Sequence, residues 1–151
     1  MPTDWVARLQ STLHAEIPLA KAMGIELVAH GERQLTLKAP LQPNINHKST
    51  AFGGSFYSIT VLTGWGLLFL LLQEEGQVGQ IVIAKSDIKY ARPVTGDLVS
   101  IGQLPGPDVC DRFLTLLRRK GKSRLELTAA IKDSNGQVAV EFYGVYVVLG
   151  T

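Results

Sequence analysis

Apolar residues at the start of the chain recur at every fourth position, which places them on one face of a helix. They are Trp5, Leu9, Leu13 and Ile17. Thr3 or Asp4 can cap this helix, and Pro18 interrupts the pattern. We therefore expect a helical N-terminal segment over about residues 3–22.

Six later segments are rich in Val, Ile, Leu and aromatic residues and are bounded by Gly, Pro, Asn or Asp, which predicts six strands. They are residues 25–29, 34–39, 81–91, 98–104, 125–132 and 138–149. The Asn135-Gly136 pair predicts a tight hairpin turn between the last two. Residues 111–119 suit a short helix or a strand, and helical spacing fits them slightly better.

Residues 49–73, between the second and third strands, form a stretch of 25 residues without a charged side chain. This length is sufficient to span a bilayer. However, glycines and hydroxyl residues weaken its hydropathy, and the strands need an apolar element to cover. We therefore expect a buried helix over about residues 53–72. The order of elements then predicts an α+β fold, in which an antiparallel sheet wraps around this helix.

The composition indicates a single domain over residues 1–151, because the chain is too short for two cores of ordinary size. Apolar residues make up 46% and charged residues 19% of the chain, which excludes intrinsic disorder. The one cysteine, Cys110, allows no internal disulfide and no cysteine-based metal site. This cysteine usage is typical of the reducing cytoplasm. The first residues show no secretory signal pattern, and we expect a cytoplasmic protein.

Positive charge is concentrated in one part of the chain, although the net charge is only +2. Six basic residues occur there without an acid between them, and we call them the basic segment: Arg112, Arg118, Arg119, Lys120, Lys122 and Arg124. Such a cluster favours an acidic partner, which can be nucleic acid, a phosphate-bearing cofactor or an acidic protein. The simpler alternative is a solvated helix end whose cations offset the helix dipole.

Two runs of residues resemble the hotdog-fold thioesterase superfamily. The first, at positions 46–54, enters the expected central helix and reads Asn-His-Lys-Ser-Thr-Ala-Phe-Gly-Gly. The second, at positions 89–97, leaves the next strand and reads Lys-Tyr-Ala-Arg-Pro-Val-Thr-Gly-Asp. With Ser55 added, the first run is most similar to the small family named for the C-terminal thioesterase-like domain of the bacterial protein YiiD.

This resemblance implies a hotdog-fold homodimer that acts on acyl thioesters of acyl carrier protein or coenzyme A, without a cofactor or a metal. Members of the family are implicated in decarboxylating malonyl-acyl carrier protein to acetyl-acyl carrier protein, which starts fatty acid synthesis. The basic segment would then dock the acidic carrier protein, near the mouth of the channel that admits its pantetheine arm.

The residue types in the first run fit an oxyanion site. The first N–H groups of a helix are unpaired and lie at the positive end of its dipole. Gly53 and Gly54 lack Cβ atoms, so a thioester carbonyl can approach these groups closely. The site would stabilise either the tetrahedral oxyanion of hydrolysis or the enolate of decarboxylation. The alternative is a tight turn into the helix, with Ser55 as a cap.

A missing acid favours decarboxylation. Thioesterases of the related phenylacetyl-CoA type carry a carboxylate seven residues after the second glycine, where this chain has Val61, and a histidine where it has Phe52. The first acid after the glycines is Glu74. Decarboxylation needs no nucleophile, only an electron sink and a poorly solvated pocket, which apolar residues such as Phe56 would provide.

Two other functions stay open. The first alternative is an acyl-CoA or acyl carrier protein thioesterase, and the second is a non-catalytic acyl- or RNA-binding module. RNA recognition favours aromatic residues among the basic ones, and the basic segment contains only Phe113. We therefore expect neither nucleic acid nor a membrane as a partner.

We expect Asn46, Gly54 and Ser55 to act in catalysis, with the Asn46 amide donating to the thioester oxygen or holding the malonyl carboxylate. Asn44 competes with Asn46, and turn formation is the simpler explanation of either. The expected substrate-binding residues are His47, Thr50, Phe52, Gly53, Val61, Tyr90 and Arg92. A solvated loop position is the alternative for His47, and an interface ion pair is the alternative for Arg92.

Overall fold

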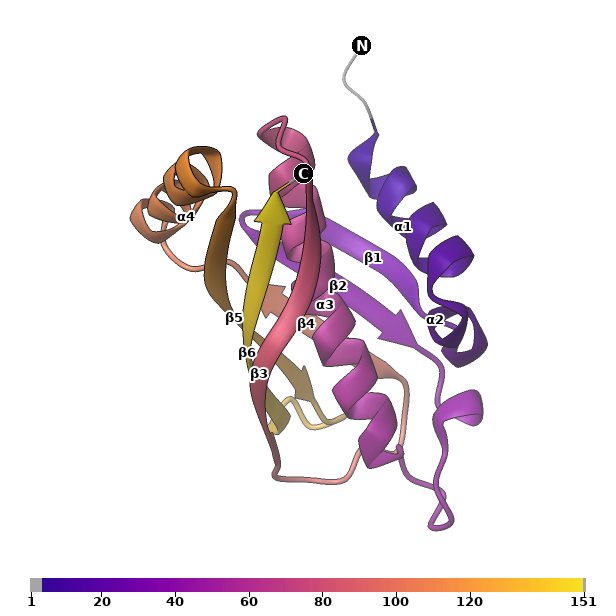
Figure 1. The fold of residues 1–151 in the computed structure, drawn as a ribbon. Coiled ribbons are helices and arrows are strands. Elements are labelled where there is room, and N and C mark those ends of the chain that lie inside the picture. Colours follow the sequence, from indigo (N-terminus) through magenta and orange to yellow (C-terminus); the bar gives the residue numbers. More distant parts are fainter. Residues whose placement is uncertain (1–3, 151) are drawn as a thin grey trace.

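The computed structural model describes residues 4–150 and has the expected α+β architecture, an antiparallel sheet curved around one long helix (Figure 1). The helices are α1 (Trp5–Glu16), α2 (Pro18–Met23), the 3₁₀ turn η1 (Gln42–Asn44), α3 (Gly53–Glu74) and α4 (Pro107–Lys120). The strands are β1 (Glu26–Gly31), β2 (Gln34–Ala39), β3 (Gly79–Tyr90), β4 (Leu98–Gln103), β5 (Lys122–Lys132) and β6 (Val138–Gly150). All six expected strands and the central helix are confirmed, with small shifts at their ends.

The N-terminal segment differs in detail from the expectation. It contains two helices, because Pro18 begins α2 after a break at Ile17. The Asp4 carboxylate caps α1 by accepting from Ala7 N at 3.0 Å, whereas Thr3 lies outside the described residues. Residues 111–119 are helical, within α4, so the strand interpretation of this segment is wrong.

The sheet order, β1-β2-β4-β5-β6-β3, leaves β1 and β3 at its two edges. β3 pairs with β6 from Gly79, opposite Gly150, to Tyr90, opposite Val140. The Tyr90 hydroxyl donates to Gly53 O at the start of α3, at 3.2 Å. β3 therefore runs back along α3 in the opposite direction, and its last residue lies beside the first residue of the helix.

α3 is the centre of the hydrophobic core. Thirteen of its 22 residues are buried, and 67% of its most apolar window lies inside the protein, although its length and composition would also suit a membrane span. The hydroxyls of Thr60 and Thr63 donate to carbonyls four residues back, at 2.8 and 2.7 Å, so both buried hydroxyls are paired. The prediction of a buried core helix is confirmed.

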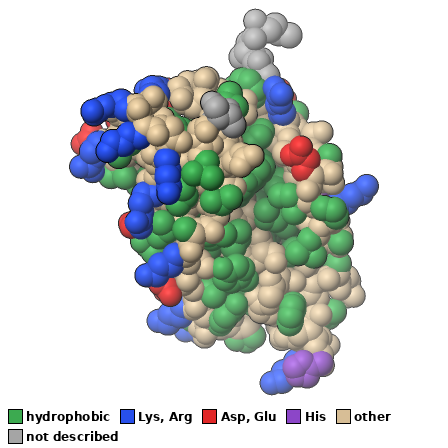
Figure 2. All heavy atoms as spheres, in the orientation of Figure 1, with side chains coloured by type: hydrophobic (Ala, Val, Ile, Leu, Met, Phe, Trp, Pro, Cys, Tyr) green, Lys and Arg blue, Asp and Glu red, His purple; other side chains and the backbone are tan. Residues whose placement is uncertain are grey.

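One stripe of α3 is covered only in part by the sheet. It consists of residues spaced four apart, which we call the open stripe: Tyr57, Val61, Trp65 and Phe69. The rings of Trp65 and Phe69 stack on one another with centroids 5.4 Å apart. Figure 2 shows hydrophobic and uncharged side chains over the middle of the molecule, where α3 and β3 lie in Figure 1.

α3 approaches β6 most closely at Gly64. A Cβ atom there would lie 2.6 Å from Cζ of Tyr146, whose side chain is 1% exposed. The Tyr146 hydroxyl donates to Val61 O at 2.6 Å. Burial, followed by repulsion from Tyr57, raises the pKa of this phenol, which keeps the donor protonated. The missing side chain at Gly64 thus makes room for a buried hydrogen bond between sheet and helix.

We expect Gly64→Ala to lower the free energy of unfolding by about 1–3 kcal/mol, because the Tyr146 ring must move. Gly66→Ala is the matched control, since both substitutions gain the same helix propensity. Its Cβ would meet the methyl ends of buried leucines, with Leu35 Cδ2 at 2.7 Å, and these have no hydrogen bond to lose when they shift. Urea unfolding measures both variants. A loss for Gly66→Ala equal to or larger than that for Gly64→Ala would contradict this account.

Candidate active site at the start of α3

The loop that leads into α3 is organised by one side chain. Asn46 Oδ1 accepts from the backbone N–H groups of Lys48 and Thr50, at 2.8 and 3.1 Å. Its Nδ2 donates to Thr50 Oγ1 at 2.8 Å and, over a longer 3.4 Å, to Ala51 O. Asn46 is half-buried, and these bonds hold the loop closed. The amide proton that points to Ala51 O is bonded only weakly. Thr50 serves as its partner.

Asn44 has a different environment and is 2% exposed. Its Nδ2 donates to Met23 O at 2.9 Å and to Pro40 O at 2.7 Å, while its backbone carbonyl accepts from Phe52 N at 2.8 Å. These bonds tie the loop to the end of α2. Because both amide protons are used within the protein, Asn44 is an anchor of the loop, and Asn46 is the better placed of the two asparagines to meet a substrate.

α3 begins with free hydrogen-bond donors. Phe52 precedes the helix and supplies no side-chain cap. Within residues 4–150, no acceptor is bonded to the N–H groups of Gly53 or Gly54. A Cβ atom at Gly54 would meet the Phe52 ring in its present position, so a larger residue would have to displace this exposed ring. Since the dipole of a long helix adds about half a positive charge here, the two N–H groups form an anion site.

A pocket of about 350 Å³ adjoins these donors. It is lined by Ala51, Gly53, Phe56, Tyr90, Ala91, Arg92 and Pro93. The Phe56 and Tyr90 rings pack against each other with centroids 6.2 Å apart. The fold therefore brings together the two runs of the sequence that resemble hotdog thioesterases, because β3 ends where α3 begins.

Sequence-predicted residues fall into two groups around this pocket. Gly53, Tyr90 and Arg92 line it, with Phe52, 55% exposed, and Gly54 beside it. Ser55 is buried, His47 is exposed on the loop, and neither lines the pocket. Val61 also does not line it, since it lies eight residues after Gly53, about 12 Å along the helix axis.

Three lining residues are absent from the sequence-based assignment: Ala51, Ala91 and Pro93. Each is a small or rigid residue inside one of the two runs, so its only signal is adjacency to the motif. Their role is steric, since they shape an apolar wall around the backbone donors.

The basic segment lies far from this pocket. Arg118 Nη2 forms an ion pair with Glu75 Oε2 at 3.4 Å, just after the last residue of α3. Figure 1 shows α4 at this end of α3, opposite to the Gly53 end. The expected position of the basic segment, near the mouth of the channel, therefore does not hold for this pocket within a single copy of the chain.

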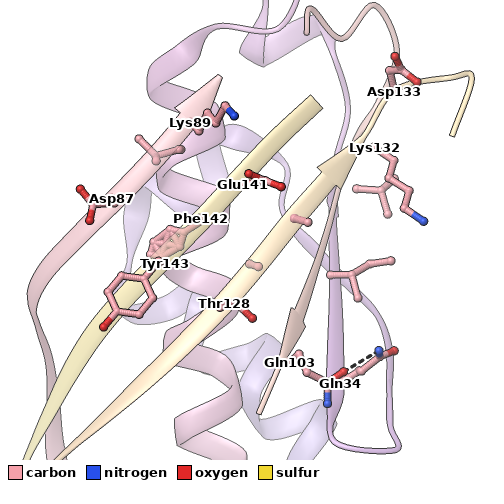
Figure 3. A pocket seen from close by; sticks show the side chains of 15 residues that line it. Gln34, Asp87, Lys89, Gln103, Thr128, Lys132, Asp133, Glu141, Phe142 and Tyr143 are labelled. Atoms are coloured by element: carbon pink, nitrogen blue, oxygen red, sulfur yellow. Dashed lines mark hydrogen bonds between the residues drawn. The ribbon is translucent and has the colours of Figure 1, made fainter. Parts of the chain in front are cut away.

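A larger hollow, of about 960 Å³, lies on the outer face of the sheet, which faces away from α3 (Figure 3). Charged side chains of both signs rim its uncharged middle, including Asp87, Lys89, Lys132 and Glu141. A hydrogen bond to Glu126 raises the pKa of the Tyr143 phenol at its wall. The sheet separates this hollow from the free N–H groups of α3, so the smaller pocket is the better candidate active site.

Known proteins resemble the chain over nearly its whole length. A family model described as "putative thioesterase (yiiD_Cterm)" matches residues 6–150. A protein of unknown function from Chlorobaculum tepidum is 34% identical, with 97% of this chain and 94% of that chain covered and a TM-score of 0.93. For a protein from Shewanella oneidensis described as a putative thioesterase, the identity is 33%, the coverage 97% and 98%, and the TM-score 0.88. A probable thioesterase from Pseudomonas aeruginosa shares the fold, with a TM-score of 0.84 at 18% identity and coverage of 100% and 99%.

Substitution of Asn46 is expected to lower activity, whereas substitution of Asn44 is expected to lower stability. Asn46→Ala should lower kcat/KM on an acyl thioester by roughly ten- to a thousandfold, the range for loss of one oxyanion-type donor. Asn44→Ala should instead lower the free energy of unfolding by about 1–3 kcal/mol, since it leaves buried carbonyls unpaired. Steady-state kinetics and urea unfolding on both variants measure this. Full activity of Asn46→Ala combined with an inactive, stably folded Asn44→Ala would reverse the assignment.

Proposed function

We propose that this chain, which belongs to the yiiD_Cterm thioesterase family of the hotdog fold, decarboxylates malonyl-acyl carrier protein to acetyl-acyl carrier protein. One observation carries the proposal: the two free N–H groups of Gly53 and Gly54 open a helix that has no charged residue before Glu74. An electron sink is thus present, while the carboxylate that would activate water or attack the thioester is missing from the helix.

The proposed step breaks the bond between the carboxylate carbon and the α-carbon of the malonyl group. Its electron pair moves into the thioester carbonyl, which becomes an enolate, and carbon dioxide leaves. The N–H groups of Gly53 and Gly54 hold the enolate oxygen. The enolate carbon then takes a proton from water and becomes the methyl group of the acetyl thioester.

Side chains around the pocket support this reaction. Phe56 and Tyr90 keep water from one side, so that the substrate carboxylate is less solvated and loses carbon dioxide more readily. Arg92 attracts the anionic substrate, and neither of the two ion pairs found among residues 4–150 involves it. Asn46 fixes the loop that leads to the glycines, and its second amide proton, which is bonded to Ala51 O only over 3.4 Å, would turn to the thioester oxygen.

Hydrolysis is the second candidate, because relatives in the family and among solved structures are described as thioesterases. A hydrolase needs a base or a nucleophile near the thioester carbon. The helix position that would supply it in the phenylacetyl-CoA type is Val61, an apolar side chain on the open stripe. This absence favours decarboxylation.

Mass spectrometry of the protein-bound product separates these functions. We expect malonyl-carrier protein to lose carbon dioxide and retain its thioester, whereas acetyl-carrier protein, the control substrate, stays unchanged. Release of free carrier thiol from both substrates would show a thioesterase and overturn the proposal. No change in either substrate would point to a binding module.

We propose further that the protein is a homodimer joined through β3. Among residues 4–150, no strand pairs with the outer side of this 12-residue edge strand, and Val82 and Ile83 on it are 46% and 36% exposed. An unpaired strand edge is a template for pairing with another chain. The open stripe of α3 lies next to it, since Tyr57 and Ser86 of β3 are hydrogen-bonded. Pairing of β3 with its copy would cover both apolar surfaces together.

The opposite edge of the sheet provides a matched control for the dimer. We expect Ile83→Asp to shift the protein from dimer to monomer, because two carboxylates would be buried in a two-fold interface. Val28→Asp places the same charge on β1, where Val28 is 56% exposed, and should leave the dimer intact. Sedimentation equilibrium measures both variants. A monomeric wild-type protein, or equal dissociation of the two variants, would contradict β3 pairing.

A further inference from the structure

We propose that the basic segment of one copy docks the carrier protein whose acyl group enters the pocket of the partner copy. This inference rests on the proposed function and on the β3-paired dimer. It assigns each active site two contributors, a pocket from one chain and a docking surface from the other.

The charges of the basic segment are almost entirely available to a partner. Among residues 4–150, only one of its six side chains, Arg118, takes part in an ion pair, and that pair is about half exposed. All six residues are exposed. Figure 2 shows Lys and Arg side chains gathered on the side of the molecule where α4 lies, with few acidic ones beside them. The surface is therefore suited to a strongly acidic partner.

Apolar side chains between these cations indicate an acidic protein. On α4, Val109 and Leu116 are 39% and 41% exposed, and they share one helix face with Arg112 and Arg119 at spacings of three and four. Protein interfaces combine apolar contacts with surrounding charge in this way. Nucleic acid would instead need exposed aromatic rings for base stacking, and Phe113 is 2% exposed.

A carrier protein whose phosphate lies at the basic segment cannot bring its arm to the pocket of the same copy. The pocket lies at the first residue of α3 and the Arg118–Glu75 ion pair lies just after its last, so the 22-residue helix separates them by about 33 Å. A phosphopantetheine arm has about thirteen bonds between phosphorus and sulphur, which span about 16 Å when extended as fully as a peptide chain.

The partner's pocket is at the correct end. β3 runs from the α3 end near the basic segment, at Gly79, to the pocket, at Tyr90. A strand that pairs with its own copy about a two-fold axis perpendicular to the sheet runs antiparallel to it. The partner's α3 therefore begins at the end where this chain's α3 finishes, and its pocket lies on the side of this chain's basic segment.

Reversing two cations tests the docking surface alone. We expect Arg119→Glu with Lys122→Glu to raise KM for malonyl-carrier protein about tenfold or more and to weaken its binding equally, since steering charges are reversed. Arg118 is left unchanged because it contacts Glu75. The control, Lys21→Glu with Lys132→Glu, alters net charge by the same amount on exposed residues outside the basic segment, and should change KM little. Equal effects of the two pairs would remove the basic segment from the proposal.

Heterodimers with differently tagged chains test which pocket the segment serves. The pocket is blocked by Gly53→Val, which fills it, or by Arg92→Glu, a surface change chosen in case the first variant misfolds. When the blocked pocket and the charge reversal are in the same chain, the remaining pocket faces a reversed docking surface, and turnover of malonyl-carrier protein should fall about tenfold or more. When they are in different chains, the remaining pocket faces an intact surface and should retain the turnover of one site.

Four outcomes separate the possible failures. The opposite ranking of the two heterodimers would show docking within one copy, and equal turnover would show that the docking surface is elsewhere. Malonyl-pantetheine, which lacks the carrier surface, should be turned over equally by both heterodimers. Failure of malonyl-carrier protein to lose carbon dioxide with the wild type would defeat the proposed function. In that case, fluorescence anisotropy still measures carrier-protein binding and thus still tests the docking surface. Tight RNA binding that the double reversal abolishes, without carrier-protein binding, would overturn the inference in favour of nucleic acid.

Discussion

The requirement to bury α3 determines most of this structure. A helix without charge before its last residue cannot face water over a large area, and a single sheet can enclose it only by curving around it. The glycines of α3 allow the sheet to approach closely, most clearly at Gly64, where the Tyr146 ring occupies the space of a side chain. The burial of α3 thus determines the curvature of the sheet, the position of the helix and the packing of the core together.

The same requirement explains the surfaces that are left open. Strands β2 to β6, together with α1 and α2, cover α3 except along the open stripe, which they cover only in part, and among residues 4–150 no strand pairs with the neighbouring edge of β3. Apolar side chains and free strand edges seldom stay together in contact with water. The dimer that we propose would satisfy both at once, and it would set the two α3 helices in opposite directions.

Catalytic capacity arises where burial is incomplete. At its first residues α3 leaves the cover of the sheet, and the backbone donors of Gly53 and Gly54 meet a small apolar pocket. A carbonyl that gains negative charge there is stabilised by fixed dipoles in surroundings that screen charge poorly. Because the helix supplies no acid, the site offers stabilisation of an oxyanion but no nucleophile, which distinguishes the proposed decarboxylase from a hydrolase on the same fold.

Much of the fold follows from local patterns. The long uncharged stretch among amphipathic strands could form only a core helix or a membrane span, and alternation in the strands identified the core helix as the consistent choice. Pro18 predicts an interruption, but the helical pattern continues beyond it, so local pattern alone does not separate the second helix, α2, from α1. In residues 111–119, Phe113 and Leu114 lie four and three residues before Leu117 and all three are buried in α4, which agrees with the better fit of helical spacing there.

The sequence by itself determined that a helix that begins with two glycines and carries no acid before its last residue would be buried, because charge and hydrophobicity are properties of the residues themselves. Only the tertiary structure decided which residues meet at its beginning. Tyr90 and Arg92 join Gly53 because β3 returns along α3, while Val61 and the basic segment lie away from the pocket for the same reason. The direction in which a strand crosses a sheet depends on contacts between distant segments, and no local pattern of residues specifies it.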